Sequence, residues 1–320
     1  MAELESVVDE SAFPIGAMAE TRWFAGDGWA IRRADRAARE PVRGSLLFVP
    51  GRGDFFEKYG ESLVYWNSRG WCVTALDWRG QGLSGRLGTD SLTGHVDDFA
   101  IWVADLAAFW AEWKTAAPGP HVLVAHSMGG HLVLRALAEG RIDPDAVILT
   151  APMLGFITHG VPLRLLHWVA RAMCALGDPR RPAWKWSEKP GALPAGRAEL
   201  LTHDPVRYAQ ESDWRGRRPG LAMGPGSWGW LRAATASMLA LDRRGVLEKV
   251  RQPILMLATS DDRLVSSAAI DRAARRLPHA EYLRFGPESA HEILREADPV
   301  RDRALAAIDD FLDRKARLRH

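Results

Sequence analysis

Residues 121 to 137 read His121-Val122-Leu123-Val124-Ala125-His126-Ser127-Met128-Gly129-Gly130-His131-Leu132-Val133-Leu134-Arg135-Ala136-Leu137. The stretch starts with an apolar run typical of a buried strand and continues, after Gly130, with the apolar spacing of a helix. A serine at a sharp turn between strand and helix projects its hydroxyl above the sheet, and crowding there requires very small residues two positions away on each side. Ala125 and Gly129 meet this requirement, so the stretch predicts Ser127 as a nucleophile. A chance match is the alternative, since these residue types also fall at this spacing by accident in long chains.

Short apolar runs recur on both sides of this stretch, with helical patterns between them. The runs predict buried strands over 45–49, 71–75, 121–124, 146–149, 254–258 and 280–285, after a hairpin over 21–34. Helices are predicted over 96–113, 128–138, 266–277 and 300–318. Continuous apolar runs indicate strands that are buried on both faces of a sheet. Strands and helices in alternation therefore predict an α/β fold, with a mostly parallel sheet and helices on both faces.

Residues 152–232 interrupt this alternation. They contain many Pro, Gly and Trp residues and no convincing buried strand, so we expect an inserted cap over 152–232 and a core made of 1–151 and 233–320. The best helix candidate in the insertion is Leu163–Ala175, where apolar residues repeat at i, i+4 and i+8. Two interpretations of this apolar stripe stay open, because periodicity does not show what the stripe contacts. It packs on the sheet domain, or it lines an apolar binding site.

A nucleophilic serine needs an imidazole to accept its proton and a carboxylate to orient the imidazole. If the chain order is serine, acid, histidine, the acid follows a late strand and the histidine follows the last one. Asp262 lies after the predicted strand 254–258, and His291 lies after 280–285. Asp261 is a direct competitor of its neighbour, and a carboxylate here could also be only a helix cap. A loop histidine is most often a surface group, so the prediction depends on the serine upstream.

Two backbone N–H groups are candidates for stabilising an oxyanion. The helix that follows the serine begins at Met128, and its first N–H groups have no partner within the helix. A second donor is expected from a loop after an early strand at the same edge of the sheet. The segment Pro50-Gly51-Arg52-Gly53 stands there, and the N–H of Arg52 is the candidate; an ordinary turn is the alternative. The Arg52 side chain is also a candidate contact for an anionic head group.

The composition is that of a globular protein without marked charge. Hydrophobic residues make up 47%, which rules out wholesale disorder, and 42 basic against 40 acidic residues provide no electrostatic footprint for nucleic acid. Cys72 and Cys174 form neither a disulfide framework nor a metal-ligand spacing, which fits a reducing compartment. The N-terminus is acidic where a secretory signal is basic, and no apolar stretch is long enough for a membrane span. We therefore expect a cytoplasmic protein, with peripheral contact with the inner membrane left open.

Taken together, these segments form a recognisable pattern: Pro50-Gly51-Arg52-Gly53 with Glu57-Lys58-Tyr59, Leu76-Asp77-Trp78-Arg79-Gly80-Gln81-Gly82-Leu83-Ser84, the turn around Ser127, Asp262-Arg263-Leu264-Val265 and His291-Glu292-Ile293-Leu294, with Leu201–Tyr208 and Trp228–Leu231 in the insertion. The chain resembles the α/β-hydrolase superfamily, and within it the serine hydrolases related to bacterial lysophospholipases and monoacylglycerol lipases. The resemblance covers about residues 20–315. Two positions depart from it, since many relatives have His-Gly where this chain has Pro50-Gly51, and Gly where it has Ala125.

The resemblance implies an α/β-hydrolase fold with an inserted cap, and a reaction that needs no metal and no organic cofactor. Carried over position by position, it assigns the nucleophile to Ser127, the orienting acid to Asp262, the base to His291, and the oxyanion donors to the backbone of Met128 and Arg52. It implies a serine hydrolase that cleaves carboxylic esters through an acyl-serine intermediate. Family membership does not determine the substrate, because pocket contacts come largely from the variable cap.

A lysophospholipid or a monoacylglycerol is the leading substrate hypothesis. The apolar helix of the insertion and its tryptophans suggest that an acyl chain is buried there, although large aromatic residues most often only pack. These tryptophans are Trp168, Trp184, Trp186, Trp214, Trp228 and Trp230. Three alternatives stay open: a general carboxylesterase or lactonase acting on small esters, an acyl transferase, and a non-catalytic binding protein with this fold. Membrane contact through the cap and the oligomeric state are also left open.

Overall fold

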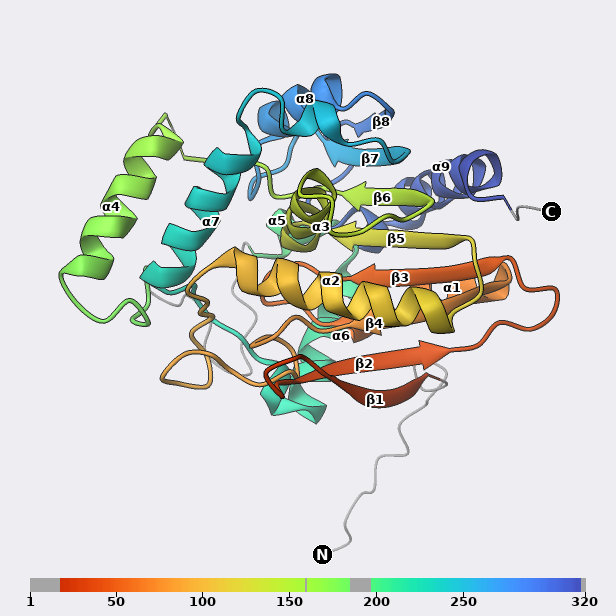
Figure 1. Ribbon diagram of the computed structural model, residues 1–320, viewed down its shortest axis with the longest axis horizontal. Coiled ribbons are helices and arrows are strands. Elements are labelled where there is room, and N and C mark those ends of the chain that lie inside the picture. The colour runs from red at the N-terminus through yellow and green to blue at the C-terminus, as the bar shows by residue number, and fades with distance from the viewer. Residues whose placement is uncertain (1–17, 159, 185–196, 318–320) are drawn as a thin grey trace, which may run out of the picture.

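The structure is a computed structural model of the chain, and it describes residues 18–158, 160–184 and 197–317. The N-terminal segment that bears on export and Trp186 of the insertion lie outside the described residues. An eight-stranded sheet runs through the molecule (Figure 1). Its strands, in order across the sheet, are β1 (Ala19–Phe24), β2 (Ala30–Arg36), β4 (Trp71–Leu76), β3 (Gly44–Val49), β5 (His121–His126), β6 (Ala146–Thr150), β7 (Ile254–Thr259) and β8 (Ala280–Phe285).

The sheet has an antiparallel edge and a parallel centre. β1 pairs with β2 and β2 with β4 in antiparallel fashion, whereas the pairs from β4 and β3 onward to β8 are parallel. The predicted hairpin, the predicted strands and the mostly parallel sheet are confirmed. Because parallel strands end at the same edge, the loops after β3, β5, β7 and β8 come together there.

Helices cover both faces of the sheet. The helices are α1 (Gly60–Ser68), α2 (Phe99–Ala116), α3 (Met128–Ala138), α4 (Leu163–Ala175), α5 (Ala198–Leu201), α6 (Pro205–Arg217), α7 (Trp228–Leu241), α8 (Ser267–Arg276) and α9 (Asp298–Lys315), and the short 3-10 helices are η3 (Phe56–Tyr59), η4 (Pro219–Leu221), η5 (Leu247–Lys249) and η6 (Ile293–Arg295). The predictions found α2, α3, α4, α8 and α9, and missed α1, α5, α6 and α7. In α6 the start signal was present, because the Asp204 carboxylate accepts the N–H groups of Val206 and Arg207, but its polar sequence hid the helix.

Two apolar cores lie on opposite faces of the sheet. Along β3, Leu47 belongs to the core under α2, α3 and α8, whereas Leu46 and Phe48 belong to the core under α1 and α9. This alternation explains why the central strands read as continuous apolar runs. β8 differs from the prediction: only Phe285 is buried in it, because β8 is the edge strand of the sheet and one side of it lacks a neighbour.

The insertion follows β6 and carries α4 to α6 and the start of α7. Its described residues contain no strand, as predicted, and the expected boundary after residue 232 falls inside α7. α4 has the predicted bounds and lies against α7, at the far end of the molecule from β1 (Figure 1). Within the described residues, no helix has the length and apolar character needed to cross a membrane.

Candidate active site

Ser127 lies at the turn between β5 and α3, in a backbone conformation that side chains rarely adopt. Its φ is 51° and its ψ is −115°. Three backbone hydrogen bonds hold this conformation: the Ser127 N–H donates to the carbonyl of Thr150 at 2.9 Å, and its carbonyl accepts from His131 and Met153. A Cβ on Gly129 would lie 2.4 Å from the Pro50 carbonyl oxygen, so the turn packs too closely for any side chain there. The small residue that the sequence pattern requires therefore has a steric cause.

His291 and Asp262 meet Ser127 at the edge of the sheet. The Ser127 Oγ lies 2.9 Å from His291 Nε2, and His291 Nδ1 lies 2.7 Å from Asp262 Oδ2. The other Asp262 oxygen accepts the N–H groups of Leu264 and Val265 at 2.8 and 2.9 Å, which fixes the carboxylate. An ionised carboxylate can only accept a hydrogen bond, so Nδ1 carries the proton of a neutral imidazole and Nε2 is left to accept a hydrogen bond from the serine hydroxyl. The three predicted side chains form one hydrogen-bonded chain.

The structure also shows which of the two neighbouring aspartates, Asp261 or Asp262, contacts His291. The Asp261 side chain is about half exposed and lies 3.5 Å from the Arg263 guanidinium, whereas Asp262 is buried against His291. Two neighbouring carboxylates therefore face different surroundings, and the one that orients the imidazole is Asp262.

The surrounding residues shift the pKa values of His291 and Asp262. Burial of the His291 ring acts to lower its pKa, but the charge and hydrogen bond of Asp262, and then Glu292, outweigh burial and raise the pKa above its usual value. Burial acts to raise the Asp262 pKa, but His291 and two backbone N–H groups hold it below its usual range. His126, whose ring centre lies 4.8 Å from that of His291, has its pKa lowered to about 4 by burial and by the charge of His291. The His126 ring is thus neutral near pH 7 and adds no charge beside the base.

The loop after β3 lies directly against the serine turn. A Cβ on Gly51 would lie 3.1 Å from the Ser127 Cβ, a tight contact, so a glycine suits this close approach of the loop. The N–H of Gly51 is 3.4 Å from Asp54 Oδ2, and the N–H of Gly53 donates to Gln81 Oε1 at 2.6 Å. These two contacts hold the backbone on either side of Arg52, the residue whose N–H is the second candidate oxyanion donor.

Gln81 is a residue that the sequence analysis did not single out. Its amide oxygen accepts from Gly53, and its amide nitrogen lies 3.8 Å from the Met128 sulfur, so one side chain touches both segments that carry the candidate oxyanion donors. Gln81 belongs to the segment 76–84, which the family resemblance had pointed out without assigning a role to it.

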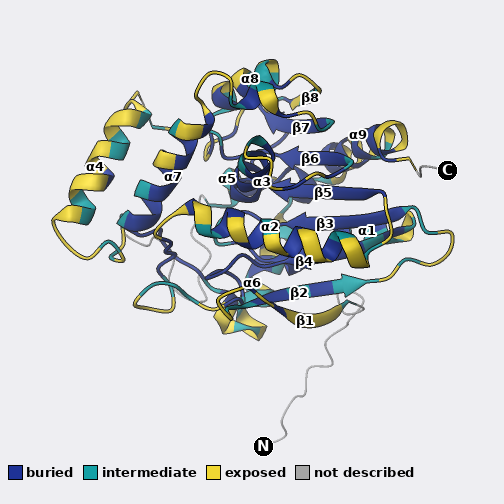
Figure 2. Ribbon diagram, in the orientation of Figure 1, coloured by how far each residue is buried: buried dark blue, intermediate teal, exposed yellow. Residues whose placement is uncertain are grey.

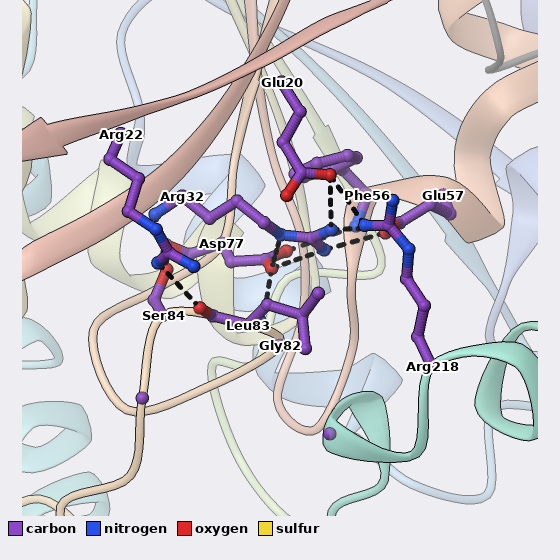
Figure 3. Close-up of polar contacts among 12 residues, drawn as sticks. Glu20, Arg22, Arg32, Phe56, Glu57, Asp77, Gly82, Leu83, Ser84 and Arg218 are labelled. Atoms are coloured by element: carbon purple, nitrogen blue, oxygen red, sulfur yellow. Dashed lines mark hydrogen bonds and ion pairs between the residues drawn. The ribbon is translucent and has the colours of Figure 1, made fainter.

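A buried ion pair anchors that segment (Figure 3). The Asp77 carboxylate accepts from Arg32 Nε at 2.7 Å and from the N–H of Leu83 at 2.9 Å, and Arg32 also pairs with Glu57 at 2.6 Å. Burial raises the pKa of Asp77 to about 6 in spite of the Arg32 charge. A Cβ on Gly82, whose φ is 52°, would collide with the Asp77 carboxylate, so this turn requires glycine. The ion pair therefore fixes the turn that contains Gln81.

A cavity of about 1030 Å³ opens onto the Ser127 hydroxyl and the His291 ring. This volume is at the upper end of the roughly 300–1,000 Å³ typical of small-molecule sites. Its walls are mainly apolar and include Phe156, Leu166, Trp184, Met223, Trp230 and Leu231. Four basic side chains and two carboxylates also line it: Arg52, Lys58, Arg197 and Arg263, with Asp54 and Glu292. Among the described residues, no group of His, Cys, Asp and Glu side chains is placed to hold a metal ion.

The tryptophans of the insertion divide between the cavity and other sites. Trp184 and Trp230 line the cavity, and both rings face the Arg52 guanidinium, at 5.2 and 5.0 Å from its central carbon. Trp214 and Trp228 pack against the two cores, and Trp168 is exposed on α4. Among the tryptophans that the structure describes, the interpretation as an acyl-binding set therefore applies to Trp184 and Trp230 at most.

Comparison with known proteins identifies the family of this chain. A family model described as serine aminopeptidase, S33, matches residues 40–298. The chain belongs to this family of α/β-hydrolases. Lysophospholipase L2 of Escherichia coli strain K12 is 32% identical to it over 288 residues, which cover 84% of this chain and 80% of the relative. The matched residues run from β3 to β8 and include the insertion and all three residues of the hydrogen-bonded chain, but not β1 and β2.

Solved structures of other proteins show the same fold. A soluble variant of monoglyceride lipase from Saccharomyces cerevisiae has a TM-score of 0.76 at 17% identity, covering 94% of this chain and 97% of its own. The monoacylglycerol lipase of Paleococcus ferrophilus has a TM-score of 0.68 at 19% identity, covering 88% and 98%. The predicted α/β-hydrolase fold, the resemblance to lysophospholipases and monoacylglycerol lipases, and the expected class of enzyme, a carboxylic-ester hydrolase, are confirmed.

Proposed function

We propose that this protein cleaves carboxylic esters of lipids through an acyl-serine intermediate on Ser127, with His291 as base and Asp262 as the orienting acid. The observation that carries the proposal is the hydrogen-bonded chain from Ser127 through His291 to Asp262, at the wall of a large and mainly apolar cavity. A serine hydroxyl is a weak nucleophile unless such a base accepts its proton.

The reaction proceeds in two halves. The Ser127 Oγ attacks the ester carbonyl carbon while His291 Nε2 takes the hydroxyl proton, and the backbone N–H groups of Met128 and Arg52 stabilise the oxyanion. His291 then returns the proton to the leaving alcohol. Water, deprotonated by the same imidazole, attacks the acyl-serine and releases the carboxylic acid. Asp262 stays ionised throughout, because His291 and two backbone N–H groups hold its pKa low.

The substrate we propose is a lysophospholipid or a monoacylglycerol. The apolar cavity walls suit an acyl chain, and the relatives named lysophospholipase L2 and monoglyceride lipase point the same way. The excess of basic over acidic side chains in the cavity favours the anionic head group of a lysophospholipid. Arg52 lies in the loop beside the serine and lines the cavity. Its side chain is the cation that we assign to that head group.

We also propose that residues 152–232 form a cap and that α4 brings it to a membrane surface. Leu165, Trp168 and Val169 of α4 are 52%, 62% and 43% exposed, and the α4 ribbon is largely exposed in Figure 2. Arg164 and Arg171 lie beside them on the surface, and an apolar stripe flanked by cations is the pattern of helices that lie in the plane of an anionic bilayer. The cytoplasmic leaflet of an inner membrane is the location that fits this pattern.

Labelling with a fluorophosphonate probe tests the nucleophile. The wild-type protein is expected to be labelled, and Ser127→Ala to be unlabelled and at least about 10⁴-fold slower on any ester. A folded wild-type protein that is not labelled and turns over no ester would instead be a binding protein with this fold.

Rates on a panel of esters test the substrate. We expect rates to rise from p-nitrophenyl acetate to p-nitrophenyl palmitate, and lysophosphatidylglycerol to be cleaved faster than monooleoylglycerol. A steep fall beyond short chains would support a small-ester carboxylesterase or lactonase. Product analysis with added glycerol distinguishes hydrolysis from acyl transfer, since only transfer forms a new ester.

A further inference from the structure

Lys58 is a fully buried cation beside the candidate active site. It lies in η3, shortly after the loop that carries Arg52, and its side chain is 2% exposed. Its ammonium group contacts three carboxylates: Asp54 at 2.7 Å, Glu292 at 2.7 Å and Glu211 at 2.9 Å. Burial alone lowers the pKa of a lysine, but these carboxylates outweigh it and raise the Lys58 pKa, so the side chain stays charged.

The three carboxylates come from three different parts of the fold. Asp54 is in the loop after β3, and its second oxygen accepts from Tyr59 at 2.7 Å and faces the N–H of Gly51 at 3.4 Å. Glu292 directly follows His291 in the chain. Glu211 is in α6 of the insertion. An ammonium group has three N–H donors, so it can serve three carboxylates at once. Lys58 therefore joins the loop beside the serine, the segment of the imidazole and a helix of the insertion at one point.

The same carboxylates face the imidazole. Glu292 and Asp54 are two of the charges that raise the His291 pKa, after Asp262. The His126 ring packs against the imidazole and is neutral near pH 7, and Arg295 pairs with Glu292. Lys58 is the cation that Asp54 and Glu292 share.

We propose that Lys58 is a positioning residue for the reaction: it holds the loop of Arg52 and the segment of His291 in register with α6, and it screens the imidazole from Asp54 and Glu292. This inference rests on the proposed function of Ser127 and His291. It predicts two separate effects of losing the ammonium group, one on geometry and one on the charge of the base.

Lys58→Met tests both effects, with Lys114→Met as the matched control. Lys114 is an ion-paired lysine on the surface, 2.6 Å from Asp143 and outside the cavity lining. For Lys58→Met we expect kcat to fall about 10- to 100-fold with KM changed less than about threefold, because the loss is in alignment. We also expect the acid limb of the pH profile of kcat/KM to move up by roughly half a pH unit or more, since Asp54 and Glu292 then act on His291 without Lys58, and Glu292 keeps only Arg295. Lys114→Met is expected to behave as the wild type.

Glu292→Gln provides a variant of opposite sign. It removes a negative charge beside the imidazole while Lys58 remains, so the acid limb is expected to move down. If the two residues mattered only for folding, both variants would lower the amount of native protein. The acid limb would then not move up in Lys58→Met and down in Glu292→Gln. If Lys58→Met does not fold, the direction of the Glu292→Gln shift decides the question.

The failure of this inference and the failure of the proposed function are distinguishable. NMR titration of the His291 ring in wild type, Lys58→Met and Glu292→Gln needs no turnover. Opposite shifts of the ring titration support the screening role even if no ester is cleaved. Folded variants whose ring titration and acid limb both match the wild type overturn the inference, whatever the substrate is.

Discussion

The two arms of the insertion differ in how they attach to the hydrolase core. The arm of α5 and α6 is attached by buried charges and backbone hydrogen bonds: Glu211 contacts Lys58, the N–H of Glu292 donates to the carbonyl of Leu201 at 2.7 Å, and Arg207 pairs with Glu61 and Asp298. The arm of α4 lies against α7 and is largely exposed (Figure 2), and its exposed residues include the apolar Leu165, Trp168 and Val169. The insertion is therefore not uniform: buried polar contacts tie α5 and α6 to the segment of His291, whereas α4, apart from Leu166 in the cavity wall, is largely exposed.

We propose that this difference separates two tasks of the insertion. Polar contacts with fixed directions hold α6 in register with the His291 segment, which suits alignment. Apolar packing is non-directional and leaves α4 free to present its outer face, which suits contact with lipid. Variants in the two arms should consequently change different measurements.

The largest expected effect is on the α6 arm. Glu211→Gln removes the carboxylate that Lys58, Arg197 and Arg215 contact, and it should cost about 3 kcal/mol of the free energy of unfolding, because buried cations lose a charged partner. Equilibrium unfolding in urea measures the loss. Val206→Ala, at an exposed position of the same helix, is the control and should change stability by less than about 0.5 kcal/mol. Equal stability of the two variants would mean that the charges of α6 do not attach it.

A smaller effect, on binding and not on stability, is expected for the α4 arm. Leu165→Ser with Trp168→Ser should weaken partitioning onto phosphatidylglycerol vesicles about 10- to 100-fold, because both exposed apolar side chains are removed. The rate on p-nitrophenyl acetate should stay the same, since neither residue lines the cavity. Vesicle sedimentation measures the partitioning. Unchanged sedimentation would show that α4 does not dock on lipid.

The pH dependence of kcat/KM should depend on His291 and not on the α4 arm. His291 must be neutral to accept the serine proton, and its pKa is raised above 6.5. Therefore kcat/KM should be half-maximal above pH 6.5 and fall about tenfold for each pH unit below that point. Initial rates from pH 5 to 9 on a soluble ester measure this limb. The α4 double variant should leave the limb in place, so a limb that moves with α4 would contradict the division between the arms.

The smallest effect is expected where α4 meets α7. The Thr235 hydroxyl lies 2.9 Å from His167 Nδ1, a neutral contact between the two helices. Thr235→Val should cost only about 1 kcal/mol of the free energy of unfolding, well below Glu211→Gln. The same urea titrations compare the two variants. A loss as large as that of Glu211→Gln would mean that α4 is held as firmly as α6.

Local patterns predicted most of the scaffold. The strand, small residue, serine, glycine and helix around Ser127 are contiguous, so the turn could be inferred without knowing anything distant. The positions of Asp262 and His291 followed from strand order, because parallel strands end at one edge of the sheet. The exposed edge of β8 and the helix α6 were missed, since apolar content does not show which strand is outermost or whether a polar helix is held by ion pairs.

The sequence alone determined the α/β-hydrolase fold, the serine turn and the chain order of the three residues, since these depend on periodicity and on short-range sterics. Only the tertiary structure decided between Asp261 and Asp262, brought Gln81 to the loop of Arg52, and gathered Asp54, Glu211 and Glu292 around Lys58. The physical reason is that electrostatic and hydrogen-bond contacts depend on distances of a few ångströms between residues far apart in the chain. No local pattern records those distances.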